Sequence, residues 1–599
     1  MSILADLNPA QQEAVTFGEG PLLILAGAGS GKTRVLTRRV MYLIDRGVAA
    51  ENILLLTFTT KAAEEMLRRV LGTKPMGGTF HGFCAKILRR DNPDFVIFDE
   101  ADQLDTIKQA MMAVGVDPKA VKPASVLHTI SQAKNELIGP LEYADYARGD
   151  FQKMVVQVYL AYQQLLKKYR AMDFDDLLME AVKLLREQPE ERWKYILVDE
   201  YQDTNKAQYE ITKLLAKKYG NLTVVGDAAQ AIYSWRGADY RNLLLLKQDF
   251  PDLTTINLER NYRSTQVILD AANKVISKNK NHPILKLWTA KNGGAKISVY
   301  EAASESDEAA YVISQVLGTK GQVLSDFAVL YRTNAQSRVF EEAFLHAGIP
   351  YVLVGGTRFY ERKEIKDVVC YLRLIINPED DVARKRAEKV GKARLSKLLV
   401  HSSWFIDKTT IEILDEVLKT TGYIELFNPD DEEDLARLEN IKELRSVAMK
   451  FPKLPEFLEN IALTEREANR RRASGSAVTL MTLHAAKGLE FKNVFLVGME
   501  EGLFPHSRAL MEPEQMEEER RLAYVGMTRA MDKLYLTYAR RRLYFGTRNS
   551  NAVSRFLADI PEELLEANQV IKKTKRLSCS WGFDESGNWK WKPEDDLPF

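Results

Sequence analysis

One nine-residue segment constrains the fold more than any other. Residues 25–33 read Leu-Ala-Gly-Ala-Gly-Ser-Gly-Lys-Thr, between the apolar run PLLIL and the helix-compatible run RVLTRRVMYLI. Glycines let backbone N–H groups close around phosphates at the start of a helix. An apolar strand, a glycine-rich loop and a helix in this order predict a P-loop, which belongs to a parallel α/β sheet.

The side chains of this loop predict a nucleotide site. Lys32 supplies a positive charge for the β- and γ-phosphates, and Thr33 supplies a hydroxyl for Mg²⁺. A strict GxxxxGK[ST] pattern requires glycine where Ala26 stands, but the strand–loop–helix context and the intact Gly-Lys-Thr outweigh this mismatch. The residues expected to surround the phosphates are Gly27, Ala28, Gly29, Ser30, Gly31, Lys32 and Thr33.

A second segment, ILVDEYQDT, is expected to complete the site. An apolar strand that ends in two carboxylates can provide Asp199 to Mg²⁺ and leave Glu200 to activate the attacking water. Such a pair after a strand is common and weak evidence by itself, but together with an upstream P-loop it is strong. The two segments predict an ATP hydrolase that uses Mg²⁺.

The rest of the chain predicts several α/β units. At 599 residues it is too long for one hydrophobic core. Short β-rich runs alternate with helical patterns, first in PLLILAG, NILLLTFT, WKYILVDE and NLTVVGD, and after Arg263 in KISVYEA, DFAVLYRT and IPYVLVG. Each group is interrupted by a mostly helical stretch, and the second resumes with AVTLMTL, NVFLVGM and KLYLTYA.

Composition sets limits on location and partners. No stretch approaches about 20 uninterrupted apolar residues, and the N-terminus lacks a basic region followed by an apolar one. Cys84, Cys370 and Cys579 are far apart, as expected of reduced thiols in a cytosolic protein. The balance of 84 basic and 83 acidic residues argues neither for nor against a nucleic-acid partner, because a cleft can hold the phosphate-binding charges.

Further motifs run in order along nearly the whole chain. They are LNPAQQEAV, TFTTKAAEEM, GTFHGF, VVGDAAQAIYSWRGA, LERNYRS, TLHAAKGLEF and EEERRLAYVGMTRA. With the P-loop and the DE pair, this series resembles the superfamily 1 DNA helicases of the UvrD/Rep/PcrA type. The resemblance implies two RecA-like parallel-sheet ATPase cores, each with a mostly helical insertion.

The resemblance also implies further nucleotide contacts. Gln11 would recognise adenine, Tyr262 would stack on it, and Gln230 would detect the γ-phosphate after the strand that precedes Asp227. Arg263 and Arg529 would be arginine fingers, with Arg529 on the second core. Glu490 would contact the nucleotide from that core, so the site would be complete only when the cores close.

The same resemblance places a single strand of DNA across the tops of the cores. Aromatic faces stack on any base and grip a strand without reading sequence, and hydroxyls add phosphate contacts. The residues implied are Phe58, Thr59, His81, Tyr233, Trp235, Thr482 and His484. Core packing is an alternative for the aromatic residues, and local hydrogen bonding to the backbone is an alternative for the histidines.

We therefore expect residues 1–90 and 181–265 to form the first core, with 91–180 as its insertion. Residues 266–376 and 477–565 would form the second core, with 377–476 as its insertion and 566–599 as a Trp-rich tail. The second insertion is shorter than in full-length relatives. It begins with seven cations between Arg384 and Lys397, and helical spacing gathers Arg386, Lys389 and Arg394 at least partly on one side. We expect this run to contact duplex phosphates, and the alternative is a solvated helix face or a counterweight to the acidic segment DDEEDLARLE.

The expected function is ATP-dependent DNA unwinding, with translocation from 3′ to 5′ on single-stranded DNA and at junctions with duplex, in replication, repair or recombination. The expected location is the cytoplasm, at the nucleoid, with no membrane contact, and the sequence does not identify any protein partners. A translocase that mainly displaces proteins is one alternative, and a nucleotide-switched scaffold with slow turnover is another. RNA is a further possible track, because stacking and phosphate contacts do not exclude a 2′-hydroxyl.

Overall fold

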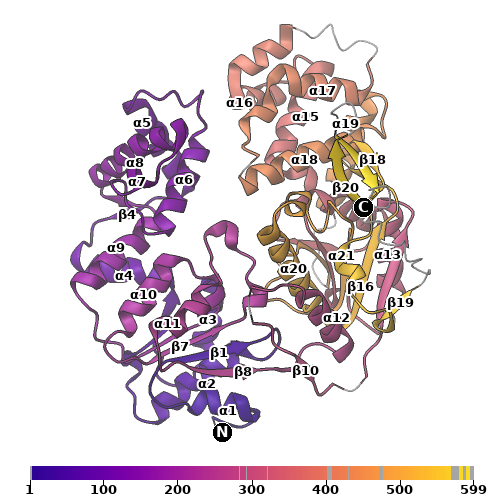
Figure 1. Ribbon diagram of the computed structural model, residues 1–599. Coiled ribbons are helices and arrows are strands. Elements are labelled where there is room, and N and C mark those ends of the chain that lie inside the picture. Colours follow the sequence, from indigo (N-terminus) through magenta and orange to yellow (C-terminus); the bar gives the residue numbers. More distant parts are fainter. Residues whose placement is uncertain are drawn as a thin grey trace.

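The computed structural model describes residues 3–281, 283–291, 293–319, 321–400, 408–429, 431–470, 476–544, 546–567, 579–583 and 589–593. Figure 1 shows two α/β cores side by side, with one group of helices above each. Among the helices described, none has both the length and the apolar character that crossing a membrane requires.

The first core is built on a six-stranded parallel sheet in the order β3-β2-β6-β7-β1-β8. Its central strands are almost entirely buried because helices cover both faces, which explains their continuous apolar runs. The strands are β1 Leu22–Ala26, β2 Ile53–Thr57, β3 Met76–Thr79, β6 Tyr195–Val198, β7 Leu222–Gly226 and β8 Thr254–Leu258. Its helices are α1 Pro9–Thr16, α2 Lys32–Asp45, α3 Thr60–Arg69, α4 Phe80–Asp91, α10 Lys206–Ala216 and α11 Asn242–Asp249.

The second core has a seven-stranded parallel sheet in the order β13-β14-β12-β15-β16-β11-β19. These strands are β11 Ile297–Ala302, β12 Phe327–Tyr331, β13 Tyr351–Val354, β14 Val478–Thr482, β15 Phe491–Leu496, β16 Ala530–Ala539 and β19 Leu565–Ala567. The helices are α12 Gln266–Ile276, α13 Glu305–Gly318, α14 Ser337–His346, α20 Pro513–Met527 and α21 Arg555–Ala558. The predicted fold class of two parallel-sheet cores is confirmed.

Both cores carry a mostly helical insertion. The first contains α5 Glu100–Ala113, α6 Pro123–Asn135, α7 Tyr143–Tyr146 and α8 Gly149–Tyr169, followed by α9 Phe174–Glu187, which packs on α4 of the first core. The second contains α15 Lys363–Ile376, α16 Asp381–Val400, α17 Thr410–Thr421, α18 Glu432–Ala448 and α19 Leu454–Arg470. Short two-stranded pairs complete the description: β4 Val96–Ile97 with β5 Ala171–Met172, β9 Arg260–Asn261 with β10 Trp288–Thr289, β17 Arg542–Tyr544 with β18 Thr547–Asn549, and β20 Cys579–Phe583 with β21 Trp589–Pro593.

The basic run at the start of α16 does not form the single cationic face that helical spacing predicts. Gly391 has non-helical backbone angles (φ 161°, ψ 115°), so the helix is kinked between Arg386 and Arg394. The Nε of Arg386 lies 2.6 Å from Asp367, and Arg394 donates to the carbonyl oxygen of Thr421 at 2.6 Å. Two of the three side chains expected to bind phosphates therefore hold the insertion together.

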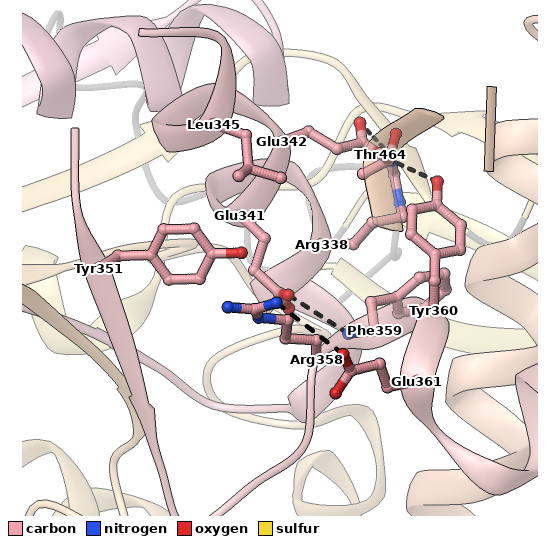
Figure 2. A pocket seen from close by; sticks show the side chains of 10 residues that line it. All are labelled: Arg338, Glu341, Glu342, Leu345, Tyr351, Arg358, Phe359, Tyr360, Glu361 and Thr464. Atoms are coloured by element: carbon pink, nitrogen blue, oxygen red, sulfur yellow. Dashed lines mark hydrogen bonds and ion pairs between the residues drawn. The ribbon is translucent and has the colours of Figure 1, made fainter. Parts of the chain in front are cut away.

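Buried ion pairs attach the second insertion to the second core. Arg338 of α14 and Glu443 of α18 are 2.6 Å apart, with exposed side-chain fractions of 1% and 4%. Figure 2 shows Arg338 beside Glu342, which also accepts a hydrogen bond from the Tyr360 hydroxyl at 2.8 Å. The cavity between these residues has a volume of about 20 Å³, enough for one water molecule and too small for a nucleotide.

A buried lysine organises the first insertion in the same way. The Nζ of Lys134 in α6 lies 2.6 Å from Asp173 and 2.8 Å from Asp176, and its side chain has no exposed surface. Burial would lower the pKa of Lys134, but the two carboxylates raise it above its ordinary value. The Tyr162 hydroxyl of α8 also donates to Asp173, at 3.0 Å, so one charged cluster joins α6, α8 and α9.

We expect Lys134→Met to destabilise the protein by about 3–5 kcal/mol at pH 7, because it leaves two carboxylates buried without a cation. The midpoint of urea unfolding measures the loss, which should shrink at acidic pH as the carboxylates take up protons. The exposed Lys183, paired with Glu180, provides the control: Lys183→Met should cost less than about 1 kcal/mol. Equal losses in the two variants would contradict the assignment.

Candidate functional site at the junction of the two cores

The P-loop has the close backbone packing that its glycines predict. It connects β1 to α2, and Gly29 and Gly31 have left-handed φ values of 66° and 86°. A Cβ atom on Gly29 would lie 2.6 Å from the Asn261 side-chain nitrogen, which itself donates to the carbonyl oxygen of Ala28 at 2.6 Å. Lys32 begins α2, and its Nζ donates to the Ala26 carbonyl oxygen at 3.1 Å. Asn261 therefore holds the loop through its backbone, and the backbone N–H groups of the loop stay at the start of α2.

The two predicted carboxylates lie beside this loop. Thr33 Oγ1 donates to Asp199 Oδ2 at 3.2 Å, and Glu200 follows directly. Burial and the neighbouring Glu200 charge raise the pKa of Asp199 to about 7. Burial would also raise the pKa of Glu200, but Lys32 and Lys487 hold it below its ordinary value. Asp199 is buried and Glu200 is partly exposed, so two adjacent carboxylates face the P-loop where a divalent cation could bind.

Two arginines lie against this site, Arg529 from the second core and Arg263 from the end of the first. Arg529 is only 2% exposed, and its Nη2 donates to Gln230 Oε1 of the first core at 3.3 Å. Burial and then the nearby Arg263 charge lower the pKa of Arg529 to about 9, which keeps the guanidinium protonated at neutral pH. Arg263 in turn contacts Glu490 of the second core, Nε to Oε2, at 2.7 Å. Side chains of both cores thus meet beside the P-loop: Gln230, Arg263, Glu490 and Arg529.

The predicted adenine contacts form the outer edge of the site. Gln11 donates through Nε2 to the carbonyl oxygen of Ser30 at 2.8 Å, which ties α1 to the P-loop. The Tyr262 hydroxyl lies 3.4 Å from Gln11 Oε1, and 40% of Tyr262 is exposed. Asn8, which sequence reasoning missed, caps α1 and donates to Tyr262 at 2.9 Å. The signal was present: Asn followed by Pro and then Gln is a helix-capping pattern.

Sequence reasoning also missed Lys487, although it lies within TLHAAKGLEF. Its Nζ reaches from the second core to Asp203 at 2.5 Å and to the carbonyl oxygen of Gln230 at 2.7 Å. The same nitrogen lies 4.9 Å from the ring centroid of Tyr233. Lys487 therefore contacts both the surroundings of the ATP site and the aromatic residues described next.

Five of the residues expected to contact DNA line one large cleft. The cleft has a volume of about 1350 Å³ and is bounded by both cores and both insertions. Phe58 and Tyr233 are stacked, with ring centroids 5.9 Å apart, and Trp235 follows edge-on at 6.5 Å with 37% of its surface exposed. The five lining residues are Phe58, His81, Trp235, Thr482 and His484.

Two expected residues are placed differently. Tyr233 lies behind the lining, between Phe58 and Lys487. Thr59 does not line the cleft, and its Oγ1 instead accepts the Ala62 N–H as the N-cap of α3. The geometry thus gives Thr59 a local structural role and leaves Thr482 as the expected hydroxyl that lines the cleft.

A P-loop whose surroundings are completed by an arginine from a second parallel-sheet core defines a class: ATP-driven motors with two RecA-like cores. Family models agree. The UvrD/REP helicase N-terminal domain matches residues 7–251, and the UvrD-like helicase C-terminal domain matches residues 256–426 and 411–541. The chain belongs to the UvrD/REP helicase family.

Curated relatives match along most of the chain. The ATP-dependent DNA helicase PcrA of Bacillus subtilis is 46% identical over 654 aligned residues, which cover 96% of this chain and 88% of the relative. PcrA of Staphylococcus aureus strain Mu50 is 43% identical, and PcrA of Staphylococcus epidermidis strain RP62A is 42% identical, with the same coverage. The first alignment is longer than the whole 599-residue chain, so this relative has residues without a counterpart here.

The surroundings of His484 generate a pH prediction. Burial and the charges of Arg332 and Arg236 lower the pKa of His484 to about 3. The unfolded chain therefore binds a proton below pH 6.5 that the folded chain does not bind, and this difference reduces stability as the pH falls. We expect His484→Gln to flatten the loss of stability between about pH 6.5 and pH 4.5, by up to about one proton in the slope. Urea midpoints across this range measure it, and His346→Gln, at an exposed site, should leave the slope unchanged.

Proposed function

We propose that the protein is an ATP-dependent DNA helicase that translocates from 3′ to 5′ on single-stranded DNA and unwinds duplex in replication, repair or recombination, in the cytoplasm at the nucleoid. The observation that carries this proposal is the contact between Arg529 and Gln230 beside the P-loop. It makes the ATP site depend on the relative position of the cores, which is what a motor requires. Membership of the UvrD/REP helicase family supports the activity.

In this proposal the P-loop N–H groups and Lys32 bind the nucleotide phosphates, and Lys32 leaves its contact with the Ala26 carbonyl oxygen to do so. Thr33 and Asp199, whose side chains are hydrogen-bonded to each other, would hold Mg²⁺. The bound ion would neutralise phosphate charge.

Glu200 accepts a proton from the water that attacks the γ-phosphoryl group. The phosphorus–oxygen bond to ADP breaks as the bond to water forms, which yields ADP and inorganic phosphate. Arg263 and Arg529 offset the negative charge that spreads over the transferred group, while Gln230 is hydrogen-bonded to Arg529. Gln11 and Tyr262 hold adenine, and Glu490 orients Arg263 through their ion pair.

Coupling to DNA follows from Lys487. This side chain touches Asp203 and the Gln230 backbone, and its charge lies over Tyr233, which stacks on Phe58. Phe58 and Trp235 form what is called the aromatic floor of the cleft below. A movement of the second core on ATP binding or release therefore acts, through Lys487 and Tyr233, on this floor. Bases of a single strand would stack on this floor at Phe58 and Trp235, with His81, Thr482 and His484 nearby.

A translocase that mainly displaces proteins is the second candidate. It is favoured by the shorter second insertion that the family resemblance implies, because a shorter insertion offers less surface to a duplex. The relative from Bacillus subtilis does have residues without a counterpart in this chain. Strand separation and removal of a bound protein block, measured on the same DNA, separate the two functions. A protein that clears the block at normal ATPase rates but leaves the duplex intact would establish the translocase.

Unwinding of duplexes with a 3′ tail, a 5′ tail or blunt ends tests the leading proposal. We expect strand separation on the 3′-tailed substrate only, and ATPase activity that rises strongly with single-stranded DNA. Lys32→Ala should abolish both activities and spare strand binding, because the P-loop and the cleft are separate surfaces. Equal unwinding of the 5′-tailed substrate would overturn the polarity, and unchanged ATPase in folded Lys32→Ala protein would overturn the site.

Arg529→Ala should slow ATP hydrolysis by about 10³–10⁵-fold with little change in ATP affinity, since an arginine finger acts mainly on the transition state. Single-turnover hydrolysis and nucleotide titration measure the two quantities separately. Arg541→Ala, at an exposed position on the same core, is the matched control and should behave like the parent protein. A defect confined to ATP affinity would make Arg529 a ground-state ligand.

A further inference from the structure

Many carboxylates line the cleft, and four of them lie at the starts of two insertion helices. Glu100 is the first residue of α5, and Asp431, Glu432 and Glu433 form the start of α18 and its N-cap. These four residues are called the acidic wall below. The aromatic floor of Phe58 and Trp235 belongs to the first core. A DNA strand in the cleft would therefore lie near both the floor and the wall.

Few ion pairs hold the carboxylates of the wall, although the charges of Arg437 and Arg332 partly oppose those of Glu100 and Glu432. In the described part of the chain, Glu100, Asp431 and Glu432 make no ion pair, and Glu433 has only a 3.2 Å contact with Arg437. Burial and the nearby Glu433 raise the pKa of Glu100, and burial together with Glu518 and Glu519 raises that of Glu432. The carboxylates therefore repel one another across the gap between α5 and α18.

The wall is held in place from both ends. The buried pair of Arg338 and Glu443 fixes α18 to the second core, and breaking such a pair is costly. Just before α18, Asn428 Nδ2 donates to Ser125 Oγ of the first insertion at 2.8 Å, and Lys122 Nζ donates to the carbonyl oxygen of Phe427. These contacts anchor the start of α18. The wall is therefore a fixed part of the cleft surface and not the free end of a solvent-exposed helix.

The cleft also contains polar groups that indicate a ligand. Thr57 of the first core and Thr333 of the second line it, with 1% and 5% of their surface exposed, and neither hydroxyl has a hydrogen-bond partner among the described residues. Buried hydroxyls are normally satisfied. Their positions on the two cores match a strand that crosses both, with polar contacts on the core side and repulsion on the insertion side.

We propose that the acidic wall is a specificity element that selects single-stranded over duplex DNA in the cleft, an inference that rests on the proposed strand path. A single strand can turn its bases to the aromatic floor and its phosphates away from the wall. A duplex carries phosphates on all sides at about one charge per 1.7 Å, so some of them must face the wall in any orientation. Repulsion therefore disfavours the duplex more than the single strand.

The test is a triple variant, Glu100→Gln with Glu432→Gln and Glu433→Gln. Asp431 is left intact because its side chain accepts the Asp434 N–H as the N-cap of α18. The control replaces three exposed glutamates of the second core and its insertion outside the cleft, Glu379, Glu456 and Glu459, by glutamine. Both variants change the net charge equally. Binding of oligo-dT and of a blunt duplex is measured by fluorescence anisotropy without nucleotide, at about 50 mM and about 200 mM salt.

We expect the wall variant to bind duplex roughly three- to tenfold more tightly at the lower salt, to bind oligo-dT at most about twofold more tightly, and to lose most of this difference at the higher salt. The proposal for the acidic wall would be wrong if affinity rose equally for both DNAs, did not rise, or rose by the same factor in the control variant. Trp235→Ala is titrated in parallel: if it does not weaken oligo-dT binding, the strand path itself is wrong. If it does and the wall variant changes nothing, only the wall is wrong.

Discussion

The structure depends on the positively charged side chain of Arg529, which reaches from the second core into the ATP site of the first. Arg529 is buried, yet it keeps its charge at neutral pH, and its hydrogen bond to Gln230 is the point where the two sheets share one active site. A buried charge needs a partner, and here the partners are a neighbouring amide and the carboxylates around the P-loop. Bringing a highly charged nucleotide into this position changes how strongly the cores attract each other. That change is the physical origin of a motor built from two otherwise ordinary α/β units.

The same constraint, that a buried charge must be satisfied, organises the molecule beyond the ATP site. Lys487 is held by Asp203 and the Gln230 backbone, and from that position its charge reaches the ring of Tyr233. Lys134 joins helices of the first insertion through two carboxylates, and Arg338 of the second core binds Glu443 of the second insertion. These clusters are expensive to break, because removing one partner leaves a bare charge in a poorly solvated site. The cores and insertions are therefore joined at a few defined points, and the cleft keeps its shape between them.

Sequence reasoning was most reliable where a local pattern has one physical meaning. The P-loop and the strand that ends in Asp199 and Glu200 lie together as predicted, because parallel strands bring their carboxyl ends to one edge of the sheet. It was least reliable for single polar residues. Thr59 caps a helix, and Arg394 bonds to backbone carbonyl oxygens behind a kink at Gly391. Such outcomes depend on which partner lies within reach, and a local spacing rule does not contain that information.

The sequence by itself indicated parallel α/β sheets, helical insertions, the P-loop and the carboxylate pair, because hydrophobic periodicity and glycine placement act over short distances. The resemblance of its motifs to a helicase family supplied the pairing of two RecA-like cores and the other residues of the ATP site. Tertiary structure decided what those residues touch. It brought Arg263 to Glu490 and Arg529 to Gln230, and it placed Lys487 against the Gln230 backbone and the ring of Tyr233. It also turned the acidic start of α18 into the cleft, opposite the aromatic floor. These contacts join residues separated by hundreds of positions, and only the packing of the whole chain determines which of them meet.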